Sequence, residues 1–144
     1  MDRQIHAWHR SNELSRRLET IPGIGPITAS AIAATVSDAT LFKSGRQLAA
    51  WIGLVPRQNS SGGKDRLGRI SKQGDPYLRR LLVVGAHAVL RFSAKSKVAS
   101  TRWAAELLAK KPYYVVAVAL ANKMARIAWA LIVSGRRFEG SAAR

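Results

Sequence analysis

The chain has 144 residues, close to the roughly 150 residues of an average domain, so we expect one domain with a buried core. Hydrophobic residues make up 47% of it, which excludes a disordered polyampholyte, and the lack of cysteine excludes a disulfide scaffold, a thiolate zinc site and a cysteine nucleophile. Its 24 lysine and arginine residues against 8 acidic ones give a formal net charge of +16, which favours a polyanionic partner, above all nucleic acid.

Helix start and stop signals recur along the chain and predict a compact all-α domain of about five to six helices. Ser44 and Asp75 are the expected N-caps of the helices that begin at 45 and 76, and Gly53 and Gly135 are expected to end the helices over 45–52 and 113–134. His6 and His9 fall in the first expected helix, where we expect them to be exposed and without a role. In chain order the expected helices cover 2–19, 26 to about 36, 45–52, 76 to about 92, about 97–110 and 113–134.

The last expected helix, Tyr113 to Ser134, is long enough to cross a bilayer. It carries Lys123 and Arg126 near its middle, and each charge costs about 3 kcal/mol at the centre of a membrane. The N-terminus lacks the apolar core of a signal peptide. We therefore expect a buried helix of a soluble protein and no membrane partner.

Between the first two expected helices the sequence reads IPGIGP, residues 21–26, which indicates a tight hairpin. Gly23 and Gly25 are expected to let the backbone turn and to expose N–H groups at the positive end of the next helix, where a phosphate binds. Ile24 completes this expected phosphate site, and Thr28 adds a hydroxyl contact. Such a helix-hairpin-helix-like site binds the DNA backbone and reads no bases. The alternative is an ordinary αα-hairpin that binds nothing.

Residues 54–74 form the one long segment without helical periodicity, and they predict a basic Gly/Ser loop. Ser60 and Ser61 stand directly before two glycines. A serine that attacks phosphorus needs an exposed Oγ, room for the phosphate and positive charge around it. On spacing alone a flexible linker is the competing interpretation. The cations expected to bind nucleic acid in this loop are Arg57, Lys64, Arg66, Arg69 and Lys72.

The expected helix over 76–92 carries Arg79 and Arg80 as further candidate phosphate contacts. Arg80, His87 and Arg91 share one face of it, which is either a DNA-facing stripe or a solvated one. No residue stands at ligand spacing from His87, so no metal site is expected.

Two other sets of residues are expected to serve the core. Asn122 and Arg126 lie on an apolar helix and are expected to satisfy each other or a loop carbonyl. Trp51, Trp103 and Trp129 are expected to pack in the core rather than to stack on bases.

Two stretches, IPGIGPITASAIAATV and FKSGRQLAAWIGLVPRQNSSGGKDRLGRISKQGDPYLRRLLVVGA, carry a resemblance. Together they resemble the C-terminal domain of the IS110 family of bacterial insertion-sequence transposases, which is related to Piv-type DNA invertases. The resemblance covers roughly residues 13–138. It implies that 20–138 is the C-terminal transposase domain, that 1–19 ends a coiled-coil linker, and that 139–144 is a frayed tail.

The resemblance also implies an activity, which is transposition by phosphoryl transfer on DNA. By the family pattern the nucleophile is Ser61, five residues after Pro56, with Ser60 as the second choice, and it forms a covalent phosphoserine link to DNA. Family members carry an N-terminal RuvC-like domain with four acidic ligands for a divalent metal such as Mg²⁺. They are guided by a structured noncoding RNA, so DNA, RNA and further copies of the chain are expected partners. The expected location is the bacterial cytoplasm, at the nucleoid.

The acidic residues depart from that family pattern, because the eight of them are scattered and show no tetrad. We therefore expect a fragment or truncated product that lacks the RuvC-like domain, holds no metal or cofactor, and binds nucleic acid without recombining it alone. A non-catalytic helix-hairpin-helix binding module is the alternative function. A third possibility is an interaction domain whose charge serves assembly with RNA.

Overall fold

The computed structural model describes residues 2–36, 38–54, 75–92 and 98–139. In these ranges all regular secondary structure is helical and there is no strand, which confirms the all-α prediction. The described residues form seven α-helices, where about five to six were predicted for the whole chain. The elements are α1 (Asp2–Ser11), α2 (Glu13–Leu18), α3 (Pro26–Thr35), the 3-10 turn η1 (Ala39–Leu41), α4 (Gly45–Ile52), α6 (Pro76–Arg91), α7 (Ala99–Leu108) and α8 (Tyr113–Ser134).

The N-terminal helix predicted over 2–19 is divided in two, and Asn12 is the cause. Its backbone is extended, with φ −106° and ψ 116°. Its side-chain oxygen accepts a hydrogen bond from the backbone N–H of Ser15 at 2.8 Å. Asparagine competes for backbone donors in this way and therefore favours a helix start over a helix interior. The prediction of one continuous helix was wrong for this reason.

A buried histidine joins α1 to α2 and α3. His9 is 5% exposed, so the expectation of an exposed histidine without a role was wrong. Its Nδ1 lies 2.6 Å from the Oγ of Ser15, and its Nε2 lies 2.7 Å from Oε1 of Glu19. The Ser15 hydroxyl lies 3.5 Å from that of Ser30 on α3. Because a buried polar ring needs partners on both nitrogens, this network fixes the packing of α1 on the helices that follow.

The predicted caps of the later helices are confirmed. The side chain of Ser44 accepts from the N–H of Gln47 at the start of α4, and the carboxylate of Asp75 accepts two N–H groups at the start of α6. Gly53 and Gly135 end α4 and α8 in the left-handed region, at φ +94° and +76°. Local sequence signals therefore set these boundaries.

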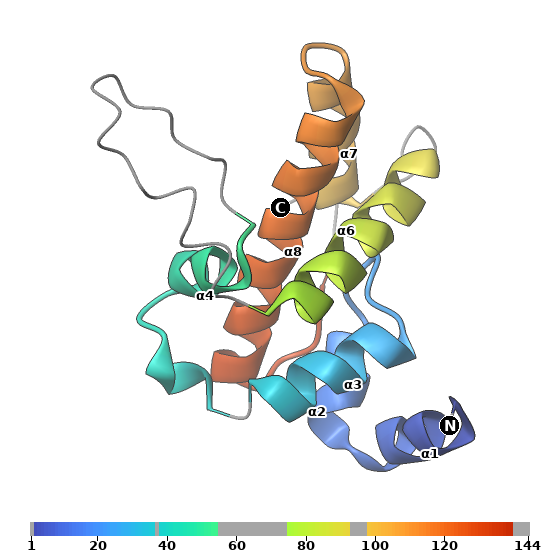
Figure 1. Ribbon diagram of the computed structural model, residues 1–144, viewed down its shortest axis with the longest axis vertical. Coiled ribbons are helices and arrows are strands. Elements are labelled where there is room, and N and C mark those ends of the chain that lie inside the picture. Colours follow the sequence, from blue (N-terminus) through green and yellow to red (C-terminus); the bar gives the residue numbers. More distant parts are fainter. Residues whose placement is uncertain (1, 37, 55–74, 93–97, 140–144) are drawn as a thin grey trace.

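The long apolar helix α8 is the centre of the fold. Figure 1 shows it running through the molecule with α4 and α6 beside it, and it packs against both of them and against α7. Its length and its mean hydropathy of 1.6 also meet the criterion for a membrane span, as the core helices of soluble proteins often do. Its buried side is formed by Val116, Ala117, Leu120, Ala121, Met124, Ala125, Ala128 and Leu131.

The turn between α2 and α3 touches α6 backbone to backbone, through two glycines. Gly23 has φ +91°, and a Cβ there would lie 2.8 Å from Cε of Met124 and 2.9 Å from Cγ2 of Val89. On α6, a Cβ at Gly85 would overlap the carbonyl oxygen of Gly23. The hairpin therefore seats directly on α6, and only glycine fits at the crossing.

The first prediction concerns this crossing. Replacing glycine by alanine in a helix interior normally gains about 1 kcal/mol from helix propensity. In Gly85→Ala the new methyl group would meet backbone that cannot move aside cheaply, so we expect a net loss of about 1–3 kcal/mol in the free energy of unfolding. Urea denaturation measures it. Val84→Ala, at an exposed position one residue away, should change stability by less than about 0.5 kcal/mol. A gain in stability in Gly85→Ala would contradict the contact.

Candidate nucleic-acid interface

The four predicted contact residues of the hairpin between α2 and α3 differ in how accessible they are. Gly23 packs inward against α6 and α8. Ile24 is buried, and its N–H donates to the carbonyl of Ile21 at 3.0 Å, inside the turn. Thr28 is buried at 7% exposure. The amide of Ile24 is thus used within the turn and the side chain of Thr28 is buried, while the phosphate contacts predicted for these two residues stay predictions.

Gly25 is the part of the hairpin that remains open. A Cβ built there meets nothing within 4 Å. Its backbone is extended, at φ −92°, so the position does not require glycine on conformational grounds. No side chain caps the first turn of α3, which Gly25 precedes. The positive end of the α3 dipole thus faces outward at Gly25, and this is where a phosphate could approach the hairpin.

Most of the predicted basic Gly/Ser loop lies outside the described residues. This holds for Ser60 and Ser61, and for the cations Arg57, Lys64, Arg66, Arg69 and Lys72. The structure does describe the residues that flank the segment 55–74. Leu54, before it, is 1% exposed. Asp75, after it, is the N-cap of α6.

Two side chains hold the chain where it leaves α4 and enters that segment. The amide of Asn122, on α8, donates to the carbonyl of Leu54 at 3.1 Å. The guanidinium of Arg79, on α6, donates to the carbonyl of Ile52 at 3.3 Å. The last carbonyls of a helix have no partner within the helix, so these two donors satisfy groups that burial would otherwise leave without a hydrogen bond. We call Asn122 and Arg79 the carbonyl clamp.

The carbonyl clamp changes the interpretation of both of its residues. Arg79 was expected to contact phosphate, whereas the structure places it half-buried with its guanidinium on a backbone carbonyl. For Asn122 the loop-carbonyl alternative is the one observed. In the sequence, Asn122 stands out as a polar residue on an otherwise apolar helix. Its partner Leu54 is 68 residues away, so the sequence did not indicate which carbonyl it binds. The end of α4 and the first turn of α6 are thereby tied together.

The structure also shows where Arg80 and the three predicted core tryptophans lie. Arg80 is exposed on α6, as a phosphate contact requires. Trp103 and Trp129 pack against the core, as predicted. Trp51 is 38% exposed and lies against Phe42, with ring centroids 5.6 Å apart, so it belongs to the core only in part.

The described residues hold no group of three histidine, cysteine or acidic side chains that could bind a metal ion. A hollow of about 230 Å³ lies beside α4 and η1, with Asp38 as its one acidic lining residue. The Thr40 hydroxyl and backbone N–H both donate to that carboxylate, which lowers the pKa of Asp38. An anionic, mostly apolar hollow does not suit a phosphate. Its lining residues are Thr35, Val36, Asp38, Leu41, Phe42 and Trp51.

Comparison with known proteins assigns the family. The sequence model of the Transposase IS116/IS110/IS902 family matches residues 15–101, from α2 into α7. The chain belongs to this transposase family. The match includes the hairpin, both residues flanking the segment 55–74, and Arg79 of the carbonyl clamp.

Three relatives show the range of the likeness. A "Probable family 20 transposase" of Pseudomonas aeruginosa is 57% identical over 132 residues, which is 92% of this chain and 39% of the relative. The "Transposase for insertion sequence element IS1111A" of Coxiella burnetii is 43% identical, over 91% of this chain and 36% of the relative. A "Pilin gene-inverting protein" of Moraxella bovis is 32% identical, over 96% of this chain and 44% of the relative. The chain thus spans about two fifths of the length of these relatives.

The second prediction tests the carbonyl clamp as a structural contact. Asn122→Ala removes the donor and leaves the buried Leu54 carbonyl without its partner. We expect a loss of about 1–3 kcal/mol in the free energy of unfolding, measured by urea denaturation. Val133→Ala, at an exposed position on the same helix, should change it by less than about 0.5 kcal/mol. Equal stability of the two variants would show that the Asn122 bond contributes nothing.

Proposed function

We propose that this chain is the DNA-binding and serine-nucleophile half of a transposase that moves an insertion sequence by phosphoryl transfer on DNA. The observation that carries the proposal is the family match across the segment 55–74, together with the carbonyl clamp at its start. A nucleophile on a loop needs fixed anchor points to present its hydroxyl reproducibly. The clamp gives the loop an anchor on two helices of the core.

In the proposed reaction, Oγ of Ser61 attacks the phosphorus of a DNA phosphodiester, with Ser60 as the second candidate. The bond that forms joins Oγ to phosphorus, and the bond that breaks joins phosphorus to a deoxyribose oxygen. The serine loses its proton and the leaving hydroxyl gains one, so the phosphate remains a diester, now linked to the protein. The negative charge that develops on the phosphoryl oxygens needs positive groups beside it, and Arg57, Lys64, Arg66, Arg69 and Lys72 are proposed to supply them.

The hairpin is proposed to hold the DNA backbone near that loop. With Ile24 and Thr28 used by the fold, the proposed contact narrows to the N-terminus of α3 at Gly25, which is open and uncapped. Exposed Arg80 on α6 is a second proposed backbone contact. Both bind phosphate and neither reads bases, so they position the DNA without setting the target sequence.

The remaining parts of the proposal come from the family. A RuvC-like domain with acidic metal ligands is proposed to act with this one, and divalent metal is assigned to that domain. Within the described residues no set of side chains fits such an ion. A structured guide RNA and further copies of the chain are the proposed partners besides DNA. The proposed location is the bacterial cytoplasm, at the nucleoid.

A non-catalytic nucleic-acid-binding module is the second candidate function. It is favoured by the open N-terminus of α3, which can hold a phosphate whether or not Ser61 reacts. The two functions differ in one observable, the covalent adduct between protein and DNA.

The third prediction addresses that adduct. In a full-length family transposase carrying this sequence at the corresponding positions, Ser61→Ala should abolish the covalent protein–DNA product and leave DNA binding intact, because only the attacking oxygen is removed. Denaturing gel electrophoresis with labelled DNA detects the adduct, and Ser60→Ala is the matched control. Adduct formation that persists in Ser61→Ala would remove Ser61 from the mechanism, and its loss in Ser60→Ala alone would assign the role to Ser60.

The fourth prediction tests the charge of the basic loop. The slope of log K against log salt reports the number of phosphates neutralised, at about 0.9 per phosphate on duplex DNA. Replacing both Arg57 and Lys64 by alanine should reduce the slope by about 0.9 for each phosphate that is no longer neutralised, as measured by fluorescence anisotropy across a salt titration. Lys43→Ala, an exposed cation outside the segment, should leave the slope unchanged. An unchanged slope in the double variant would rule out binding of the DNA backbone by these two cations.

A further inference from the structure

The exposed side of α6 carries a continuous stripe of aromatic and basic side chains. Its members follow each other at spacings of three and four residues, which places them on one side of a helix. The opposite side of α6 is buried through Leu78, Leu82, Ala86 and Leu90. We call this set the α6 stripe. It consists of the exposed residues Tyr77, Arg80, Val84 and Arg91 and the half-buried His87.

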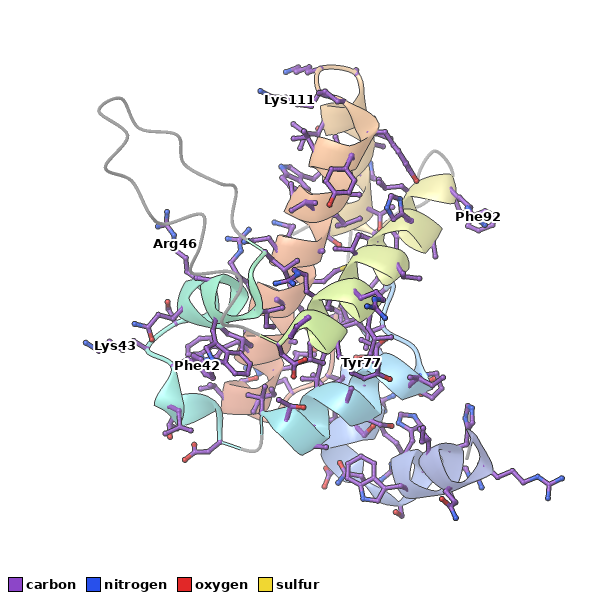
Figure 2. All side chains as sticks on the ribbon, in the orientation of Figure 1. Phe42, Lys43, Arg46, Tyr77, Phe92 and Lys111 are labelled. Atoms are coloured by element: carbon purple, nitrogen blue, oxygen red, sulfur yellow. The ribbon has the colours of Figure 1, made fainter. Side chains whose placement is uncertain are left out.

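The α6 stripe has an exposed ring near each end. Tyr77, in the first turn, is 51% exposed. Near the other end, His87 lies against Tyr113 of α8, with ring centroids 5.2 Å apart and planes tilted by 42°. Tyr113 is itself 42% exposed. Ten residues of helix, or about 15 Å, separate Tyr77 from His87, and Figure 2 shows Tyr77 and Phe92 at opposite ends of α6.

The permanently charged side chains of the α6 stripe, Arg80 and Arg91, are both basic. Residues 76–92 contain three arginines and no acidic residue, and residues 107–134 contain no acidic residue either. Lys110 and Lys111 directly precede the first turn of α8, where Tyr113 lies. Asp75 stands next to the stripe in sequence, but its carboxylate accepts the N–H groups of Tyr77 and Leu78. Arg80 and Arg91 of the stripe therefore favour an anionic partner on this surface.

From these observations we propose that the α6 stripe, with Tyr113, binds unpaired nucleotides of a DNA strand. Tyrosine rings offer stacking faces to unpaired bases, and arginines contact the phosphates between them. In duplex DNA the base faces are covered by neighbouring pairs, so exposed tyrosines would find no stacking partner. The proposal rests on DNA as the substrate in the proposed function, but it does not depend on Ser61 or on the residues 55–74.

Stacking and charge can be measured separately on the 144-residue chain, with fluorescence anisotropy of labelled oligothymidine. The double variant Tyr77→Leu/Tyr113→Leu keeps apolar bulk and removes both rings, and we expect it to weaken binding by about tenfold or more without a change in salt slope. The variant Tyr77→Phe/Tyr113→Phe keeps the rings and should bind within about twofold of the parent chain, since stacking needs only the ring. Trp8→Leu removes an exposed ring on α1 and should bind like the parent.

The contribution of charge is tested with the double variant Arg80→Gln/Arg91→Gln. It should lower the slope of log K against log salt by about 0.7 for each single-strand phosphate that is no longer neutralised. Thermal melts by circular dichroism confirm that each variant is folded. A matching duplex serves as a second ligand, and the leucine variant should bind it as the parent does. Oligouridine serves as the third ligand.

Three losses of affinity, and one absence of an effect, would overturn the proposal. The first is a loss of affinity in the phenylalanine variant, or in Trp8→Leu, as large as the loss in the leucine variant. The second is a loss of affinity as large on the duplex as on oligothymidine. The third is a loss on oligouridine alone, which would assign the surface to RNA. If the parent chain binds oligothymidine and the leucine variant binds it equally well, the α6 stripe is rejected but the proposed function still stands. If the leucine variant loses affinity as predicted but no covalent protein–DNA adduct forms, only the serine step is rejected.

Discussion

The candidate site depends on one interaction, in which Arg79 and Asn122 bind the carbonyls of Ile52, the last residue of α4, and of Leu54, which follows it. A helix that ends at the entrance to a polar segment leaves carbonyl groups that must find donors. Here the donors come from α8 and α6, two core helices far away in the sequence. One end of the segment 55–74 is therefore fixed by the same helices that form the centre of the domain.

The hairpin is joined to the same two helices by a different kind of contact. Gly23 sits against Gly85 of α6 and Met124 of α8 with no room for a Cβ at the crossing. Close packing of backbone on backbone leaves little freedom to shift. The open end of α3 at Gly25 and the end of α4 at the carbonyl clamp are thus both joined to α6 and α8. The proposed attack on DNA requires fixed points of this kind.

The acidic residues are few, and several of those described serve the fold. Asp75 caps α6, Glu19 lies on the buried His9, and Asp38 accepts from Thr40. Some stretches of the sequence, such as residues 107–134, carry basic residues and no acidic ones. Self-repulsion among so many cations destabilises a compact chain unless a polyanion is present, and the α6 stripe is one surface where such a partner can lie.

The features that could be predicted from the amino-acid sequence are those that depend on local interactions. The sequence predicted the all-α fold, the caps at Ser44 and Asp75, and the glycine ends of α4 and α8, because a cap acts within a few residues of its own position. The resemblance it carries led to the transposase family. Four features emerge only from the packing of the helices: the burial of His9, the bond of Arg79 to a carbonyl, the burial of Ile24 and Thr28, and the contact of Gly85 with Gly23. Each of these features depends on a partner from another helix or turn. The periodicity of the sequence does not show which helices and turns will pack against each other.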